Sequence, residues 1–183
     1  IVTGLVGSEM CIRDSIRPFY FRQGNIPIYA GERVIKALKN RFDYIFRTDG
    51  NIPGTPRVTI HEINENFEFY ESEVIVLNAF HGSLPIYGFR IDNTAYFTDV
   101  KTIPESEFEK LKNLDVLVIN ALRMEEHYSH LNLSDALAVI SKIKPRRAYL
   151  THISHKLGFH EEVQKKLPDN VFLAYDGLEV ECN

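Results

Sequence analysis

The feature that most constrains the fold is a series of apolar segments, each typical of a buried strand, that lead to a histidine or an aspartate. The segments are VLNAF, AYFT, VLVINAL and YLT. The first ends at His81, the second at Asp99 and the fourth at His152, whereas the third leads into a polar loop that closes at His130. Binding groups in layered folds gather where strand ends and their loops meet. We therefore expect these four side chains to meet at one edge of the fold.

The chemical types of these side chains favour a metal site. Three imidazoles and a carboxylate form a mixed nitrogen and oxygen set, which suits zinc, manganese or iron rather than calcium. The two cysteines, Cys11 and Cys182, lie near opposite ends of the chain, which argues against a structural zinc site and against a disulfide framework. A simpler interpretation stays open at this stage: the set forms only a hydrogen-bonded polar cluster.

The histidines differ in their expected surroundings. His152 lies within YLTHI, a segment that suits a buried strand, so we expect its ring to be buried and its nitrogens to be bound. His61 belongs to an early alternating strand and is predicted to face solvent. His127, His155 and His160 lie in polar loops, where we expect surface positions or contacts that support the site.

The spacing of apolar residues predicts a mixed α/β (α+β) fold in which helices cover sheets. A block of β-rich segments, with a hairpin turn at Asp92-Asn93, predicts a largely antiparallel sheet, and the second half alternates helices with strands. The predicted strands are 26–30, 58–63, 67–80, 84–92, 94–100, 115–122, 146–153 and 171–182, the last with a bend at Asp176-Gly177; the predicted helices are 31–42, 104–114, 133–143 and 160–167.

Charge and hydropathy argue against several classes of partner. The 183 residues carry a formal net charge of -4, which gives no general attraction to nucleic acid. The sequence has no run of eighteen apolar residues, and its opening IVTGLVG is too short and lacks the basic residues of a signal peptide. We expect a cytoplasmic protein that contacts neither membrane nor nucleic acid.

Four stretches carry a resemblance to a known family. They are HGSLPIYGFRIDNTAYFTDV, HLNLSDAL, YLTHISH and AYDGLEV. Together they resemble the second half of a metallo-β-lactamase-fold hydrolase, and within that superfamily the branch that contains the phosphoribosyl 1,2-cyclic phosphate phosphodiesterase. The resemblance covers roughly residues 16–183. It implies a four-layer αββα sandwich with a dinuclear metal site at the loop edge between two sheets.

The resemblance also implies roles for the four strand-end residues. His81 matches a metal-binding histidine, Asp99 the aspartate that bridges both metals, and His152 the last metal-binding histidine. His130, in a His-x-Asn-Leu pattern, matches a histidine near the substrate phosphate and is the candidate general acid. The implied cofactors are two divalent ions, zinc or manganese, that activate a hydroxide for attack at phosphorus. The substrate-binding residues stay unassigned.

One family signature, His-x-His-x-Asp-His, is missing before IRPF at residues 16–19. The preceding residues hold no metal donors at the needed spacing and resemble a translated adapter sequence. We therefore expect residues 1–15 to be a foreign or unstructured leader, and residues 16–183 to be the C-terminal two-thirds of a single domain that is incomplete at its N-terminus. With most of the usual donors missing, the chain by itself is expected to bind metal weakly or not at all and to be inactive.

The predicted function of the intact parent is metal-dependent hydrolysis of a small cyclic phosphodiester or sugar phosphate ester. Two further enzymes of the same fold stay open, a transfer-RNA 3′ processing endonuclease and a cofactor-biosynthesis accessory protein related to pyrroloquinoline quinone. A non-catalytic binding scaffold is the alternative from another class. The sequence leaves the oligomeric state open, a homodimer included.

Overall fold

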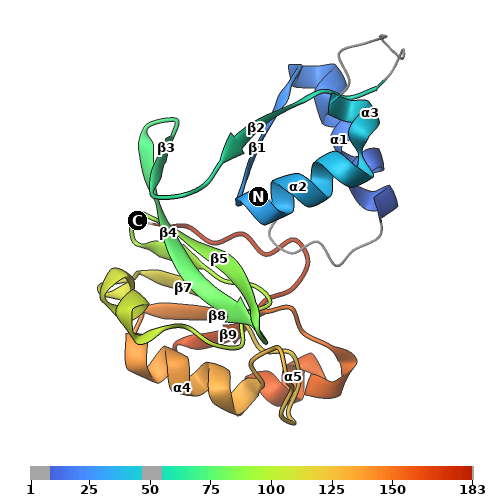
Figure 1. Cartoon of the computed structure of the whole chain (residues 1–183). Helices are drawn as coiled ribbons and strands as arrows, with labels where there is room; N and C mark the ends of the chain where they lie inside the picture. The colour runs from blue at the N-terminus through green and yellow to red at the C-terminus, as the bar shows by residue number, and fades with distance from the viewer. Residues whose placement is uncertain (1–8, 47–54, 183) are drawn as a thin grey trace. The chain divides into compact units, whose positions relative to one another are not determined.

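The computed structural model describes residues 9–46 and 55–182. It divides between Glu65 and Asn66 into two compact units, here called unit 1 and unit 2. The expected mixed α/β class is confirmed, with helices and sheets in both units (Figure 1). The two units are described separately below.

Unit 1 contains three helices and a pair of parallel strands within its described residues. The elements are α1 (Glu9–Gln23), β1 (Ile26–Ala30), α2 (Glu32–Arg41), α3 (Asp43–Phe46) and β2 (Val58–Glu62). The apolar residues at helical spacing in α2 bury Leu38 against Phe42 and Ile45, and β1 and β2 pack on the same small core. The predicted strand–helix pair at residues 26–42 is confirmed.

Two expectations for this unit need comment. The block of β-rich segments that predicts a largely antiparallel sheet begins with residues 58–63, and for this first strand the prediction is wrong: β2 pairs in parallel with β1, with Ile26 opposite Val58 and Ala30 opposite Glu62. The foreign or unstructured leader expected over residues 1–15 stays a prediction, because residues 1–8 lie outside the described residues; residues 9–15 form the first part of α1. The loose region at residues 48–56 lies mostly outside them as well.

Unit 2 is built on a seven-stranded sheet in the order β3-β4-β5-β6-β7-β8-β9. Strands β3 to β6 are antiparallel, as predicted, and β6 to β9 are parallel. The strands are β3 (Phe67–Phe69), β4 (Ser72–His81), β5 (Leu84–Ile91), β6 (Thr94–Tyr96), β7 (Val116–Asn120), β8 (Arg147–Thr151) and β9 (Val171–Leu173); the helices are η1 (Glu105–Leu111), α4 (Leu133–Ile143), η2 (His155–Leu157) and α5 (His160–Gln164).

The core of unit 2 lies between this sheet and its helices. The apolar run of β7 buries Leu117 fully, as expected for a central parallel strand. Ala136 and Ile140 of α4 belong to the same core as Leu117 and Leu150 of β8, and α4 lies along the sheet (Figure 1). Helix α4 begins where Asn132 caps it, since the Asn132 side chain accepts a hydrogen bond from the backbone N–H of Asp135 at 2.8 Å.

Three predicted elements of unit 2 differ clearly from the structure. The single strand expected at 67–80 is two antiparallel strands, β3 and β4, separated by a turn at Tyr70-Glu71. The helix expected at 104–114 is a short 3₁₀ helix, η1, a form that is common in brief helical segments. The final strand is confined to Val171–Leu173, because its partner β8 ends at Thr151 and leaves no neighbour for a longer strand. The turns at Asp92-Asn93 and Asp176-Gly177 are confirmed.

Strand direction explains why distant residues meet. Strands β4 and β6 both run antiparallel to β5, so β4 points the same way as β6, β7 and β8. Asn120 of β7 pairs with Thr151 of β8, so the residues that follow these two strands leave the sheet side by side. The carboxyl ends of β4, β6, β7 and β8 therefore lie along one edge of the sheet.

Candidate metal centre

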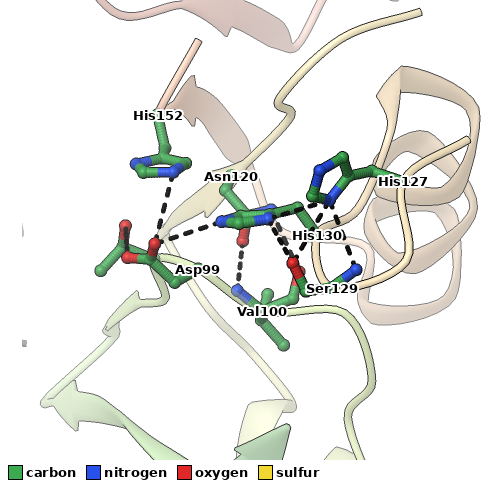
Figure 2. A network of polar contacts seen from close by, with 8 residues as sticks. Asp99, Val100, Asn120, His127, Ser129, His130 and His152 are labelled. Carbon is green, nitrogen blue, oxygen red and sulfur yellow. Dashed lines mark hydrogen bonds and ion pairs between the residues drawn. The ribbon is translucent and has the colours of Figure 1, made fainter. Parts of the chain in front are cut away.

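The four predicted site residues converge at this edge of unit 2, and we call them the histidine–aspartate cluster: His81, Asp99, His130 and His152. Asp99 lies at the centre, because its Oδ1 is 3.2 Å from Nε2 of His130 and 3.3 Å from Nε2 of His152 (Figure 2). The ring of His130 stacks on that of His152 at 5.0 Å between centroids and meets His81 edge-on at 4.5 Å. The expectation of convergence is confirmed.

The donor atoms of the cluster have the spacing of a metal site. His81, Asp99 and His130 each offer one ligand atom, and these three atoms lie within 4.8 Å of one another. Nε2 of His81 is buried and has no hydrogen-bond partner in residues 9–46 and 55–182, an arrangement that costs free energy unless another group binds the nitrogen. An unpaired imidazole nitrogen in a residue that has ligand spacing with a carboxylate suits a divalent cation.

The cluster differs from the sequence-based description in two respects. The three residues with ligand spacing include His130, which the resemblance gives as the general acid, rather than His152. His152 was expected to be buried, which is wrong: its side chain is 38% exposed. It follows directly after the end of β8, where the chain leaves the sheet, so its ring turns toward Asp99 rather than into the core.

The backbone holds two of these residues in a costly conformation. Asp99 has φ 61° and His152 has φ 54°, in the left-handed region that residues other than glycine seldom adopt. Such strain persists only where surrounding contacts enforce it, and it gathers at functional sites. The carboxylate of Asp99 is oriented further by the Thr98 hydroxyl, which donates to Oδ2 at 2.8 Å and leaves Oδ1 to the histidines.

Asn120 supports Asp99 and was not among the predicted site residues. Its side chain is fully buried; its Oδ1 accepts from the backbone N–H of Val100 at 2.7 Å, and its Nδ2 donates to the carbonyl of Val100 at 3.1 Å (Figure 2). Val100 follows Asp99 directly, so this pair of bonds fixes the chain beside the carboxylate. The signal was in the sequence: a single amide interrupts the apolar run VLVINAL.

His127 and Ser129 lie behind His130, on the side away from Asp99. The Ser129 Oγ is 2.9 Å and the His127 Nδ1 is 3.2 Å from Nδ1 of His130 (Figure 2). The sequence predicts either a surface position or a supporting contact for His127, and the structure shows the supporting contact, with His130. Ser129, only 1% exposed, was not singled out from the sequence.

Burial and neighbouring charges set the protonation of these rings. Burial lowers the pKa of His130 below its ordinary value, and the hydrogen bond to Asp99 opposes this effect without cancelling it. Burial also lowers the pKa of His127, with a further contribution from the nearby Arg123 guanidinium. Both rings are therefore neutral over more of the physiological range than free imidazole.

Comparison with known families identifies the type of domain. Residues 12–153 match the sequence model of a family described as the β-lactamase superfamily domain. A protein of Porphyromonas gingivalis named octanoyltransferase is 36% identical over 157 residues, which are 84% of this chain and 32% of that protein. The chain thus spans about a third of that relative.

Comparison with solved structures gives the same fold. A structure described as a new diphosphatase from the PhnP family is 35% identical with a TM-score of 0.81, over 92% of this chain and 66% of that one. The short form of human tRNase Z is 16% identical with a TM-score of 0.69, over 100% of this chain and 78% of that one. The second likeness concerns the fold alone.

In the part of the chain that the structure describes, no helix has the length and apolar character to cross a bilayer.

Proposed function

The chain belongs to the β-lactamase superfamily and has the fold of its metallo-hydrolases; from this premise we propose that its intact parent acts as a metal-dependent hydrolase of a phosphodiester in a small cyclic phosphate or sugar phosphate. The observation that carries the proposal is the ligand spacing of His81, Asp99 and His130, together with the buried Nε2 of His81, which has no hydrogen-bond partner among the described residues. Support for phosphate chemistry comes from the diphosphatase that shares 35% identity.

The residues of the cluster divide the work as follows. His81, Asp99 and His152 would hold divalent ions, zinc or manganese; Oδ1 of Asp99 is the oxygen that His130 and His152 face. Bound divalent ions supply Lewis acidity, which polarises phosphoryl oxygens and lowers the pKa of a water molecule. The ring of His130 stacks on that of His152 and contacts the same Asp99 oxygen, so His130 would lie beside the ions and could act on a bound phosphate as general acid.

Residues around the cluster hold its ligand groups in position. Asn120 and Thr98 fix the carboxylate of Asp99 before any ligand arrives, so less conformational freedom is lost on binding. Burial of His130 limits access of water on its inner side. An arrangement of this kind favours phosphoryl chemistry, in which positioning and electrostatic stabilisation carry most of the rate enhancement.

Metal binding by the described cluster gives the first test. The protein labelled with ¹⁵N is titrated with Mn²⁺, whose unpaired electrons broaden NMR signals of nearby nuclei even when binding is weak. We expect selective broadening of the ring signals of His81, His130 and His152, and its loss in His81→Ala. The matched control is His61→Ala, since His61 is exposed and contributes no atom to the cluster. Equal broadening in His81→Ala would overturn the proposed metal site.

Turnover gives the second test. The gene upstream of residue 16 is examined for the His-x-His-x-Asp-His loop, and the corresponding full product is assayed with a cyclic ribose phosphate. Hydrolysis with bound metal supports the proposal. An intact upstream sequence without the loop, or a metal-loaded protein that cleaves no phosphate ester, would favour the binding scaffold instead. The expected inactivity of the present chain alone stays a prediction, which the same assay tests.

A second candidate is hydrolysis of a diphosphate. It is favoured by the description of the 35% identical structure as a diphosphatase. Parallel assays with a cyclic phosphodiester and with a linear diphosphate ester separate the two substrates. The endonuclease alternative is supported only by a structure at 16% identity, which concerns the fold.

A further inference from the structure

The chain between β7 and α4 forms a closed loop, residues 123–130, here called the 123–130 loop. Two backbone hydrogen bonds close its base: the N–H of Leu122 donates to the carbonyl of Leu131, and the N–H of Leu133 donates to the carbonyl of Arg123, each at 3.0 Å. Compact loops whose ends lie close together are frequently functional. The base fixes where the loop leaves and re-enters the fold, but it leaves the path of the residues between them open.

The backbone inside the loop does not set this path by itself. No hydrogen bond between two backbone groups of the described chain involves residues 124–130. The backbone N–H of Ser129 donates to Nδ1 of His127 at 3.3 Å, but both residues belong to the loop, so this bond does not tie it to anything else. Side-chain bonds and packing must therefore determine the path of the segment.

Arg123 supplies such side-chain bonds from the start of the loop. Its Nε–H donates to the backbone carbonyl of Glu125 at 3.3 Å, and its Nη2 donates to the carbonyl of Glu126 at 2.5 Å. A guanidinium presents its N–H groups in a rigid planar fork, so two consecutive carbonyls must face the same side chain. The first half of the loop is thereby wrapped around Arg123, which sets the direction in which the chain enters His127.

The second half of the loop lies against two residues of the cluster. Oγ of Ser129 and Nδ1 of His127 are 2.9 Å and 3.2 Å from Nδ1 of His130 (Figure 2). This half also approaches the turn that follows His81, because a Cβ built on Gly82 would lie 3.4 Å from the Cβ of Ser129. A shift of the loop would therefore disturb the cluster on both sides at once.

We infer that Arg123 is a positioning residue for the histidine–aspartate cluster. It fixes the path of the 123–130 loop through two carbonyls, and the loop in turn holds His127 and Ser129 against the ring of His130. The consequence for ion binding rests on the proposed function. Replacement of groups that orient a metal site lowers affinity by about 10- to 100-fold, and since Arg123 acts one step further out, we expect the lower end of that range.

Arg90 provides a matched control within unit 2. Its guanidinium also donates to backbone carbonyls: to Asp92 at 2.7 Å, to Lys110 at 2.6 Å and to Lys112 at 3.0 Å. Arg90 lies near the end of β5, which runs opposite to β4, so it is at the edge of the sheet away from the cluster. Arg90→Met and Arg123→Met thus remove the same kind of bond from opposite edges.

The first measurement needs neither metal nor activity. Nuclear Overhauser effects between the ring protons of His127 and His130, whose centroids are 5.0 Å apart, are recorded on the metal-free chain. We expect these signals to fall at least twofold in Arg123→Met and to persist in Arg90→Met. Arg123→Lys should keep part of the signal, because one ammonium can still donate to a carbonyl. Full retention in Arg123→Met would overturn the inference, as would full retention in Arg123→Lys if the methionine variant does not fold.

Metal affinity connects the loop with the proposed function. We expect Arg123→Met to weaken Mn²⁺ binding by about tenfold, Arg123→Lys to give an intermediate affinity, and Arg90→Met to leave the affinity unchanged. Unchanged affinity in Arg123→Met, or an equal fall in Arg90→Met, would overturn the inference. Absence of Mn²⁺ binding in every protein would count against the proposed function, whereas the contact between the two rings would still decide the role of Arg123.

Discussion

Replacement of Asn120 by alanine should destabilise unit 2 and loosen the cluster together, because one side chain serves both. Asn120 and Val100 are fully buried. The side chain accepts from the backbone N–H of Val100 and donates to its carbonyl. In Asn120→Ala both bonds disappear, and water has no access to replace them.

The expected loss differs between the two backbone groups of Val100. Its carbonyl keeps a second bond, since the backbone N–H of Leu131 donates to it at 2.8 Å. Its N–H has no other partner among the described contacts, and a buried unsatisfied donor costs about 1–3 kcal/mol. The space left by the amide adds a smaller cavity cost, so the free energy of unfolding should fall by about 2–4 kcal/mol.

Asn170→Ala is the matched control. The Asn170 side chain is partly buried and makes a single bond, to the carbonyl of Pro145 at 3.2 Å. Loss of one such bond costs about 0.5–1.5 kcal/mol. Pro145 precedes the first residue of β8, whereas His152 of the cluster follows the last, so replacement of Asn170 should leave Mn²⁺ affinity unchanged.

Two measurements decide the outcome. Urea unfolding followed by circular dichroism gives the free energy of unfolding of each variant, and NMR titration with Mn²⁺ gives the affinity. We expect Asn120→Ala to lose more in both measurements than Asn170→Ala. A stability within about 0.5 kcal/mol of the unsubstituted protein would refute the claim that the Val100 N–H depends on Asn120. Unchanged Mn²⁺ affinity would refute its role in placing Asp99.

Two further predictions concern packing and pH. A Cβ on Gly88 would lie 2.4 Å from the ring of Phe97, so Gly88→Ala should lower the free energy of unfolding by about 1–3 kcal/mol, with partial recovery in Gly88→Ala/Phe97→Leu on urea unfolding. Burial raises the pKa of Glu107, but hydrogen bonds from Lys110 and Asn78 lower it by more, to below the ordinary 4.5. The stability that ionised Glu107 provides is therefore complete above about pH 5 and is lost as the pH falls through the folded-state pKa. The difference in free energy of unfolding between the unsubstituted protein and Glu107→Gln should shrink below pH 4.5. A difference that stays constant with pH would contradict this reasoning.

The sequence predicted the strands of unit 2 well because their signals are local. The apolar run of β7 and the hairpin between β5 and β6 depend on neighbouring residues alone. The parallel pairing of β1 with β2 does not, because residues far apart in the chain must meet, and alternation in VTIHEI is equally compatible with either partner direction. The same limit applies to the end of β9, which is set by the length of β8.

The site shows the same division between local and non-local information. The placement of His81, Asp99 and His152 follows from strands that point the same way, so residue type at a strand end was sufficient to predict their meeting. The contacts behind His130 are different, because they depend on the turn that brings Ser129 and His127 to Nδ1 of its ring. No residue pattern in the loop marks that turn. The sequence could therefore identify the donors of the cluster, whereas the residues that support His130 are visible only in the structure.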